Sequence, residues 1–563
     1  MAKQLRGIGV SPGAAAGPAY ALAPAPQLPS PTGGSDPATE LPRANTALAA
    51  VAAELTRRAE HTPLADAAEI LRAQALMADD PVLRDAVAAA VTAGADAPHA
   101  IDSALAEHRR AFLAAGGYLA DRVTDLDDLR DRAVAACLDL PMPGIPDPGC
   151  PFVLVAADLA PADTAGLDPT QVLAVVTESG GPTSHTAILA RSLGLPAVVG
   201  CRQVRKVPDG TVLAVDGTTG EVTIAPEPAT VAALTKREQA RRRRLAATSG
   251  PGRTADGQPV GLLANLGQPA ELAAAHAAGA EGVGLFRTEL LYLDRPTPPS
   301  LDEQIAMYTE LFTRAGDGRV VVRTLDAGAD KPLPFLANDT TGTTEPNPAL
   351  GVRGYRLRRR GPEVLASQLK AIGVAAQTTG AQVWVMAPMI ATPAEAAEFA
   401  ADCRAHGVTR TGVMIEVPAA ALQARAIAAE VDFLSIGTND LSQYAFAADR
   451  ECADLADLLD PWQPALLGLI GACTEAGRVA GIPVGVCGEA AADPALAVVL
   501  AGLGVNSLSM APAAIPAVRD SLANHQLADC QRAAEAALAA PDAARARTVA
   551  RSIARTMEGL RLE

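Results

Sequence analysis

The second half of the chain repeats one pattern, in which a short apolar run is followed by a helical stretch. Eight such runs fall within about 300 residues, which matches a (β/α)8 barrel in number and size. The runs are Val260–Ala264, Gly282–Phe286, Val320–Arg323, Val383–Met386, Gly412–Ile415, Phe433–Ile436, Pro483–Cys487 and Ser507–Met510. We therefore predict a TIM barrel over residues 255–563.

Polar residues gather at the C-terminal ends of five of these runs, the face on which barrel enzymes build their sites. Guanidinium and ammonium groups there could surround an anion that carries several charges. These cations are Arg287, Arg323, Lys331, Arg353 and Arg450. Each alone could form an ordinary surface ion pair, but together at one face they favour a ligand site.

Two carboxylates, Glu416 and Asp440, follow consecutive predicted strands and should lie side by side. Such a pair, with room for substrate oxygens and water, is typical of a Mg²⁺ site, and Asn439 adds a neutral donor. Cys487 ends another strand among these groups. It is either an inert core thiol or, beside cations, a group that exchanges a proton or attacks an electrophile.

A glycine pair at residues 180–181 leads into Pro182-Thr183-Ser184 and then into an apolar helical run that begins at His185. Thr183 and Ser184 are good N-cap residues, so His185 should stand on the first helical turn. The backbone N–H groups and the helix dipole there favour an anion, which suits a histidine that accepts a phosphoryl group. The alternative is a histidine with only a structural role in the capping turn.

The first half of the chain contains regions of different composition. Residues 38–138 read as four or five helices in a bundle, with breaks near 62–63, 79–81 and 116–117. Short strands are predicted at 152–156, 172–176, 197–199, 211–215 and 221–224, and a strand at 1–22 should rejoin them. We expect an α/β domain of residues 1–22 plus 139–225, an inserted helical domain of 23–138 and a linker helix in 226–254.

Bulk properties exclude several classes of function. The net charge of −16 argues against nucleic acid, because a phosphate backbone requires a basic footprint. The eight cysteines contain no C-x-x-C pair, which indicates a reducing cytoplasm rather than a disulfide framework. Glycine and proline interrupt the apolar residues near the start, and no apolar span elsewhere is long enough for a membrane helix, so no membrane insertion is expected.

The motifs resemble those of Enzyme I of the sugar phosphotransferase system, the phosphoenolpyruvate–protein phosphotransferases. The resemblance covers nearly the whole chain. Its motifs lie at 11–13, 156–161, 180–186, 282–289, 323–326, 330–331, 347–348, 351–353, 413–418, 435–440, 449–450 and 485–489. It implies a multidomain α/β protein with a swivelling phosphohistidine domain, an inserted helical domain that docks the carrier HPr, and a C-terminal (β/α)8 barrel that binds phosphoenolpyruvate and forms a homodimer.

The resemblance also implies roles for individual residues. His185 would accept the phosphoryl group of phosphoenolpyruvate on Nε2 and pass it to HPr, with Thr164 fixing the imidazole tautomer. Glu416 and Asp440 would hold Mg²⁺, and Cys487 would protonate the enolate to release pyruvate. The substrate's phosphate and carboxylate would be bound by Arg287, Arg323, Lys331, Arg353, Asn439, Asp440 and Arg450.

Two positions depart from the family pattern. Asp127 stands where many relatives carry an arginine near the phosphohistidine, and Pro182 replaces a frequent arginine, as in the dikinases of pyruvate metabolism. Those dikinases and phosphoenolpyruvate synthase are one alternative, but they require an ATP-binding domain, and the residues before the histidine domain read as helices without a glycine-rich nucleotide loop. A non-catalytic regulatory phosphocarrier is the other alternative, and it would lack a functional set at the barrel mouth.

Overall fold

The computed structural model describes residues 3–553 except 23–24, 32–35, 62–73, 116–122, 142, 160–166, 182–183, 293–294, 296, 329–332, 334, 336–344, 346, 450–451, 453–454 and 456. The chain divides into two compact units. One comprises residues 1–179 and 195–234, and the other residues 180–194 and 235–563.

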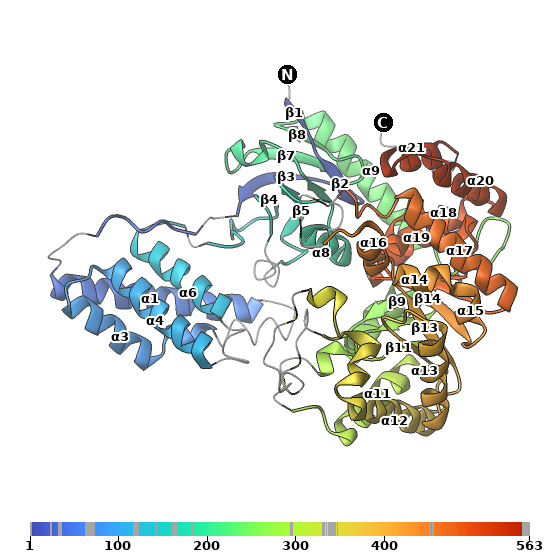
Figure 1. Ribbon diagram of the computed structural model, residues 1–563. Coiled ribbons are helices and arrows are strands. Elements are labelled where there is room, and N and C mark those ends of the chain that lie inside the picture. The colour runs from blue at the N-terminus through green and yellow to red at the C-terminus, as the bar shows by residue number, and fades with distance from the viewer. Residues whose placement is uncertain are drawn as a thin grey trace. The chain divides into compact units, whose positions relative to one another are not determined.

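The first unit contains an eight-stranded mixed sheet, in the order β1-β8-β7-β3-β4-β5-β6-β2 (Figure 1). Its strands are β1 (Lys3–Arg6), β2 (Ile8–Ser11), β3 (Ala14–Ala21), β4 (Phe152–Ala156), β5 (Val172–Thr177), β6 (Ala197–Val199), β7 (Val212–Asp216) and β8 (Glu221–Ile224). The expectation that the first 22 residues rejoin this sheet is confirmed, but they form three strands rather than one. Gly7 makes this possible, because a Cβ there would lie 2.6 Å from the carbonyl oxygen of Val199.

The helices of the first unit lie between β3 and β4 in the chain. Those described are α1 (Pro37–His61), α3 (Pro81–Thr92), α4 (Ala97–Ala115) and α6 (Val123–Cys137). They pack as a small bundle around buried alanine, leucine and valine side chains, among them Leu48, Val87 and Ile101. Asp80 caps α3, since its carboxylate accepts the N–H of Val82 at 2.8 Å. The predicted breaks near 62–63 and 116–117 lie outside the described residues.

The second unit contains a closed barrel of eight parallel strands, which confirms the predicted fold class (Figure 1). The strands are β9 (Gly261–Leu266), β10 (Gly282–Phe286), β11 (Arg319–Arg323), β12 (Val383–Ala387), β13 (Thr411–Ile415), β14 (Phe433–Ile436), β15 (Val484–Val486) and β16 (Ser507–Met510). β16 pairs with β9 to close the barrel. Each apolar run identified in the sequence contains one of these strands or overlaps it.

Helices surround the barrel (Figure 1). They are α10 (Leu272–Ala277), α11 (Leu301–Ala315), α12 (Pro362–Thr379), α13 (Pro393–Ala405), α14 (Pro418–Leu422), α15 (Ala424–Ala428), α16 (Thr438–Phe446), α17 (Pro464–Ala480), α18 (Pro494–Gly502), α19 (Ile515–Ala523), α20 (Leu527–Leu538) and α21 (Ala543–Ile553). Alternate strand residues pack outward on these helices, as Val413, Ile415, Leu434 and Ile436 do. The intervening residues face the barrel interior.

Two further helices lie near the positions where the chain passes from one unit to the other. Helix α9 (Pro228–Ala247) occupies the predicted linker, and α8 (His185–Leu193) lies in the second unit. No described helix combines the length and the apolar character that crossing a bilayer requires.

Candidate functional site

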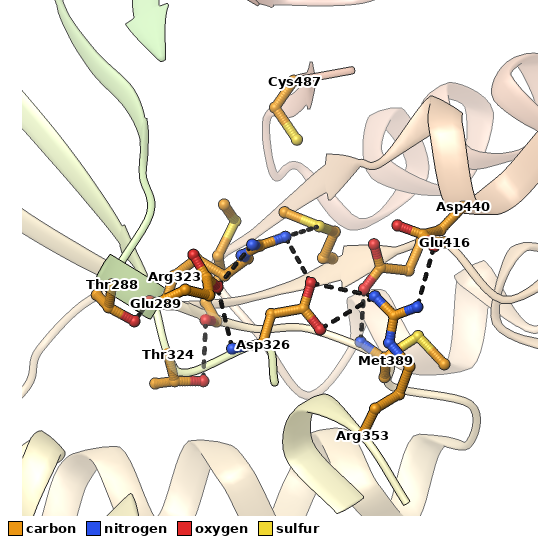
Figure 2. Close-up of polar contacts among 12 residues, drawn as sticks. Thr288, Glu289, Arg323, Thr324, Asp326, Arg353, Met389, Glu416, Asp440 and Cys487 are labelled. Carbon is orange, nitrogen blue, oxygen red and sulfur yellow. Dashed lines mark hydrogen bonds and ion pairs between the residues drawn. The ribbon is translucent and has the colours of Figure 1, made fainter. Parts of the chain in front are cut away.

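A network of buried arginines and carboxylates occupies the C-terminal end of the barrel (Figure 2). Arg323, the last residue of β11, contacts Glu289 at 2.7 Å and Asp326 at 2.9 Å. Arg353 contacts both Asp326 and Asp440 at 3.3 Å. Asp326 is thus shared by two guanidinium groups. The structure brings Arg323, Arg353 and Asp440 together at this end of the barrel, with Arg353 in the segment between β11 and α12.

Arg323 is a buried cation that could bind an anionic ligand. Burial alone would lower the pKa of Arg323, but Asp326, Glu289 and Glu416 raise it well above the usual value, so the side chain stays cationic. Its Nε atom is buried without a hydrogen-bond partner among the described residues. A buried donor without a partner costs free energy, which an oxygen of a bound ligand would recover.

Glu416 follows β13 and is 1% exposed. Its Oε1 accepts the backbone N–H of Met389 at 2.7 Å. Burial, together with the nearby carboxylates Asp440 and Asp326, raises the pKa of Glu416 to about 8. Met389 itself has a φ of 60°, a left-handed conformation that costs a non-glycine residue about 1–3 kcal/mol. The local backbone is therefore strained in the conformation that directs this N–H at Glu416.

The donor set fits a divalent cation. The buried groups of the network are four carboxyls and two guanidiniums, namely Glu289, Asp326, Glu416 and Asp440 with Arg323 and Arg353. Two negative charges are in excess when all are ionised. No cluster of three or more His, Cys, Asp or Glu residues arranged for a metal occurs in the described part of the chain. A pair such as Glu416 and Asp440 suits Mg²⁺, which takes its other ligands from water and phosphate.

Cys487 lies just beyond β15, 5% exposed, and its sulfur points toward the arginine–carboxylate network (Figure 2). Its Sγ donates to the carbonyl oxygen of Ile436 at 3.5 Å. Burial raises the pKa of the thiol to about 11, against the lowering effects of a hydrogen bond from Ser435 and of the cations Arg323 and Arg287. At neutral pH the thiol carries its proton, as a general acid must.

The remaining described candidates lie at the same end of the barrel. Arg287 follows β10 and is exposed. Asn439, on α16, is also exposed, and its Oδ1 accepts the N–H of Glu489 at 3.1 Å, which fixes the segment that follows Cys487. Lys331, Arg450 and Thr164, and also Pro182, lie outside the described residues.

His185 is the first residue of α8, as predicted. Ser184 is the N-cap, and its Oγ accepts the N–H of Ala187 at 3.3 Å. Residues 180–194 belong to the barrel unit, in which Arg191 Nε of α8 lies 3.2 Å from Glu489 Oε2. The helix that begins with His185 therefore contacts the segment that carries Cys487.

The Asp127 position is also described. Its carboxylate pairs with Arg109 at 3.2 Å and lies 3.8 Å from Arg130. The anion at this position is thus held by two cations of the helical bundle.

Three residues of the network were not assigned a role from the sequence. Asp326 and Glu289 stand in motifs that were noted, but their side chains could equally have faced solvent. Asp326 follows Arg323 by three residues, a spacing that could have suggested the pair. Met389 contributes only its backbone N–H, and the identity of its side chain does not indicate that role.

Three family models match this chain in order. They describe a PEP-utilising enzyme, with its N-terminal part at residues 6–122, its mobile domain at 149–220 and its PEP-binding domain at 241–527. Curated relatives match nearly end to end. A phosphoenolpyruvate-protein phosphotransferase of Streptomyces coelicolor is 52% identical over 98% of this chain and 99% of its own. One of Haloferax volcanii is 39% identical over 96% and 97%, and one of Staphylococcus carnosus is 36% identical over 92% and 93%.

The barrel, its ionic mouth and the three matching models define a PEP-utilising enzyme. With the full-length similarity to curated relatives, the chain belongs to the phosphoenolpyruvate-protein phosphotransferase family.

Proposed function

We propose that this enzyme transfers the phosphoryl group of phosphoenolpyruvate to Nε2 of its own His185 and then to a histidine of HPr, and that it releases pyruvate. The observation that carries the proposal is the joint position of Arg323, Arg353 and Cys487 at one end of the barrel. Phosphoenolpyruvate presents a phosphate, a carboxylate and an enol oxygen, so it requires several cations and a proton donor. This site offers both.

The described residues have roles that their environments support. Arg323 and Arg353, with Arg287 and Asn439, bind and orient the substrate. Lys331 and Arg450, which lie outside the described residues, are proposed to do the same from the family resemblance. Bidentate guanidinium groups suit both of its anionic ends, and fixed charge is the main aid to a loose phosphoryl-transfer transition state.

Glu416 and Asp440 would hold Mg²⁺. The bound ion would neutralise part of the charge on the phosphate. The excess of carboxyls in the buried network supports this assignment.

Cys487 donates its proton to C3 of the enolate, which makes the transfer effectively one-way. The protonated state of the thiol at neutral pH and its position beside the cations support this role. Thr164 would fix the tautomer of His185. The helices between β3 and β4 would dock HPr, and the barrel would form a homodimer.

To test this proposal, the purified full chain is incubated with ³²P-phosphoenolpyruvate and Mg²⁺, with and without HPr and ATP. We expect label on the native protein without ATP, transfer to HPr, and no label on His185→Ala. His276→Ala is the matched control, because His276 is an exposed histidine on α10. Acid-labile label retained by His185→Ala would place the acceptor elsewhere, and a requirement for ATP would favour a dikinase.

A second measurement tests the acid. In Cys487→Ala, pyruvate formation should slow much more than phosphoenolpyruvate binding weakens, by about 100-fold or more for a lost general acid. Pyruvate formation at the native rate would return Cys487 to a packing role.

A further inference from the structure

The interior of the barrel is divided into an apolar half and a polar half. Strands β10 to β13 and the first residue of β14 contribute the apolar residues Leu285, Val321, Trp384, Met386, Met414 and Phe433. Apart from Leu263, the inward positions of β9, β15, β16 and the later part of β14 carry small or polar residues, among them Asn265, Ser435, Gly485, Ser507 and Ser509. Barrel interiors are usually filled by bulky branched side chains, so a run of serines and glycines is unusual.

A small cavity of about 20 Å³ lies between the two halves, because its lining also includes Val321, Trp384 and Phe433 of the apolar half. Its lining includes Cys487 and the three serines Ser435, Ser507 and Ser509. It also includes Arg319, where β11 begins, so it extends toward the end of the barrel opposite the candidate site. The volume is sufficient for about one water molecule, and the hydroxyl groups supply the two to four polar partners that a buried water requires.

Hydrogen bonds connect this polar half to Cys487. The hydroxyl of Ser435 donates to the sulfur, and this hydrogen bond is the largest of the effects that oppose the rise of the thiol pKa on burial. Asn265 Nδ2 donates to the carbonyl oxygen of Cys487 at 3.0 Å, and its Oδ1 accepts the hydroxyl of Ser509 at 2.5 Å. The thiol is therefore held from the barrel interior while its outer side faces the arginine–carboxylate network.

We propose that Ser435 is a positioning residue for Cys487 and carries the proton that restores its thiol, drawn from water in the interior cavity. This inference rests on the proposed role of Cys487 as the acid. In that step the S–H bond breaks and a C–H bond forms at C3 of the enolate, which leaves a thiolate. The Ser435 hydroxyl passes its proton to the sulfur and takes one from water, and buffer acid neutralises the hydroxide.

Two features favour this route over return of the proton through the barrel mouth. In the proposed function the mouth holds the substrate's anionic groups and the product, whereas the cavity extends toward the other end of the barrel. The charged groups that act on the thiol, Glu416, Arg323 and Arg287, all belong to the mouth. The arginines cannot act as acids at neutral pH, and Glu416 would have lost its proton as a ligand of Mg²⁺. Ser435 is the hydroxyl on the interior side that contacts the sulfur.

Serines could instead merely fill the small space opposite Trp384 and Phe433, whose rings lie 4.9 Å apart. The two roles predict different behaviour of Ser435→Ala and Ser435→Thr. If Ser435 only fills space, Ser435→Ala should behave like the native protein and Ser435→Thr should not. If Ser435 carries a proton, Ser435→Ala should lose this function and Ser435→Thr should keep it.

The test uses the full-length protein and two readouts. The first is the pH dependence of Cys487 alkylation by iodoacetamide, followed on the isolated peptide by mass spectrometry. The second is exchange of the methyl protons of pyruvate into D₂O with Mg²⁺, followed by NMR. Ser435→Ala should shift the thiol titration to higher pH and slow exchange about tenfold or more, since a hydrogen bond to a charged group is lost. Ser435→Thr should restore both readouts.

Two further variants complete the design. Ser521→Ala is the matched control, because Ser521 is 5% exposed, Ser435 is 6% exposed, and the Ser521 hydroxyl instead donates to the carbonyl of Pro494 at 2.6 Å. It should leave both readouts unchanged. Ser507→Val fills the cavity and keeps the Ser435 hydroxyl, so it should slow exchange and leave the thiol titration in place. It keeps the test decisive if Ser435→Ala does not fold.

Native exchange and native thiol titration in Ser435→Ala would overturn the inference while the role of Cys487 stands. Equal losses in Ser435→Ala and Ser435→Thr, or native exchange in Ser507→Val, would also overturn it. If Cys487→Ser exchanges pyruvate protons at the native rate, the proposed acid is wrong and the inference fails with it.

Discussion

Binding of Mg²⁺ at the barrel mouth should release a proton at neutral pH. Without the ion, burial and the carboxylates Asp440 and Asp326 raise the pKa of Glu416 to about 8. A metal ligand must be deprotonated, so proton and ion compete for this carboxyl. Well below pH 8 the apparent affinity should fall about tenfold per pH unit. Between pH 8, where the carboxyl is half ionised, and pH 6 it should fall about 50-fold, or about 2.3 kcal/mol. Above pH 8 it should level off.

The assay titrates Mn²⁺, a spectroscopic substitute that also prefers carboxylate and water ligands, and follows the loss of the free-ion EPR signal from pH 6 to pH 9. In Glu416→Gln the affinity should be lower and nearly independent of pH. Glu238→Gln is the matched control, because Glu238 is also a buried glutamate but is paired with Arg241 at 2.7 Å. A native affinity that is the same at pH 6 and pH 8 would refute the reasoning about Glu416.

Three further predictions concern stability, and urea unfolding followed by tryptophan fluorescence tests each, since both tryptophans lie in the barrel unit. Without Mg²⁺ the barrel should lose stability as the pH rises from about 4.5 to about 8, because folded Glu416 keeps a proton that the unfolded chain has lost; a flat profile would contradict its raised pKa. Asp326→Asn should cost about 3–5 kcal/mol, since two buried arginines lose their shared partner; a loss below about 1 kcal/mol would mean that solvent screens the pairs. Gly488→Ala should cost about 1–3 kcal/mol, because its Cβ would lie 1.9 Å from Thr438 Oγ1. Gly468→Ala, in α17 with open space around the added methyl, should instead gain up to about 1 kcal/mol, and equal effects of the two would argue against the close approach at Gly488.

The barrel could be predicted because each strand is a short apolar run and each run is followed by a helix. For β10, β14 and β16 the predicted and observed bounds agree. The convergence of Glu416 and Asp440 followed from topology alone, since consecutive parallel strands end at the same face. The order of the strands therefore predicted that these carboxylates meet at one end of the barrel, and their role as metal ligands stays a prediction.

Other features could not be predicted from local sequence patterns. The first 22 residues contain three strands because Gly7 and Gly13 let the chain turn within one apolar stretch, and apolar content does not reveal such turns. The helical region has a break at Gly94, with φ of 101°, that was not predicted. The strained backbone of Met389 depends on packing against Glu416, which only the folded chain defines.

The network also bears on how the site selects its ligand. Both buried arginines are already held by carboxylates, so a substrate must exchange ion partners rather than meet unoccupied cations. Asp326 is the carboxylate common to Arg323 and Arg353, and a ligand that displaces it must compensate for both contacts. Glu289 would still pair with Arg323 and Asp440 with Arg353, but a ligand with one negative charge would replace only one of the two Asp326 contacts and leave the other arginine with one carboxylate fewer, which is costly. The site therefore favours a ligand with two separate anionic groups, and the strength of the Asp326 contacts sets how strongly singly charged competitors are rejected.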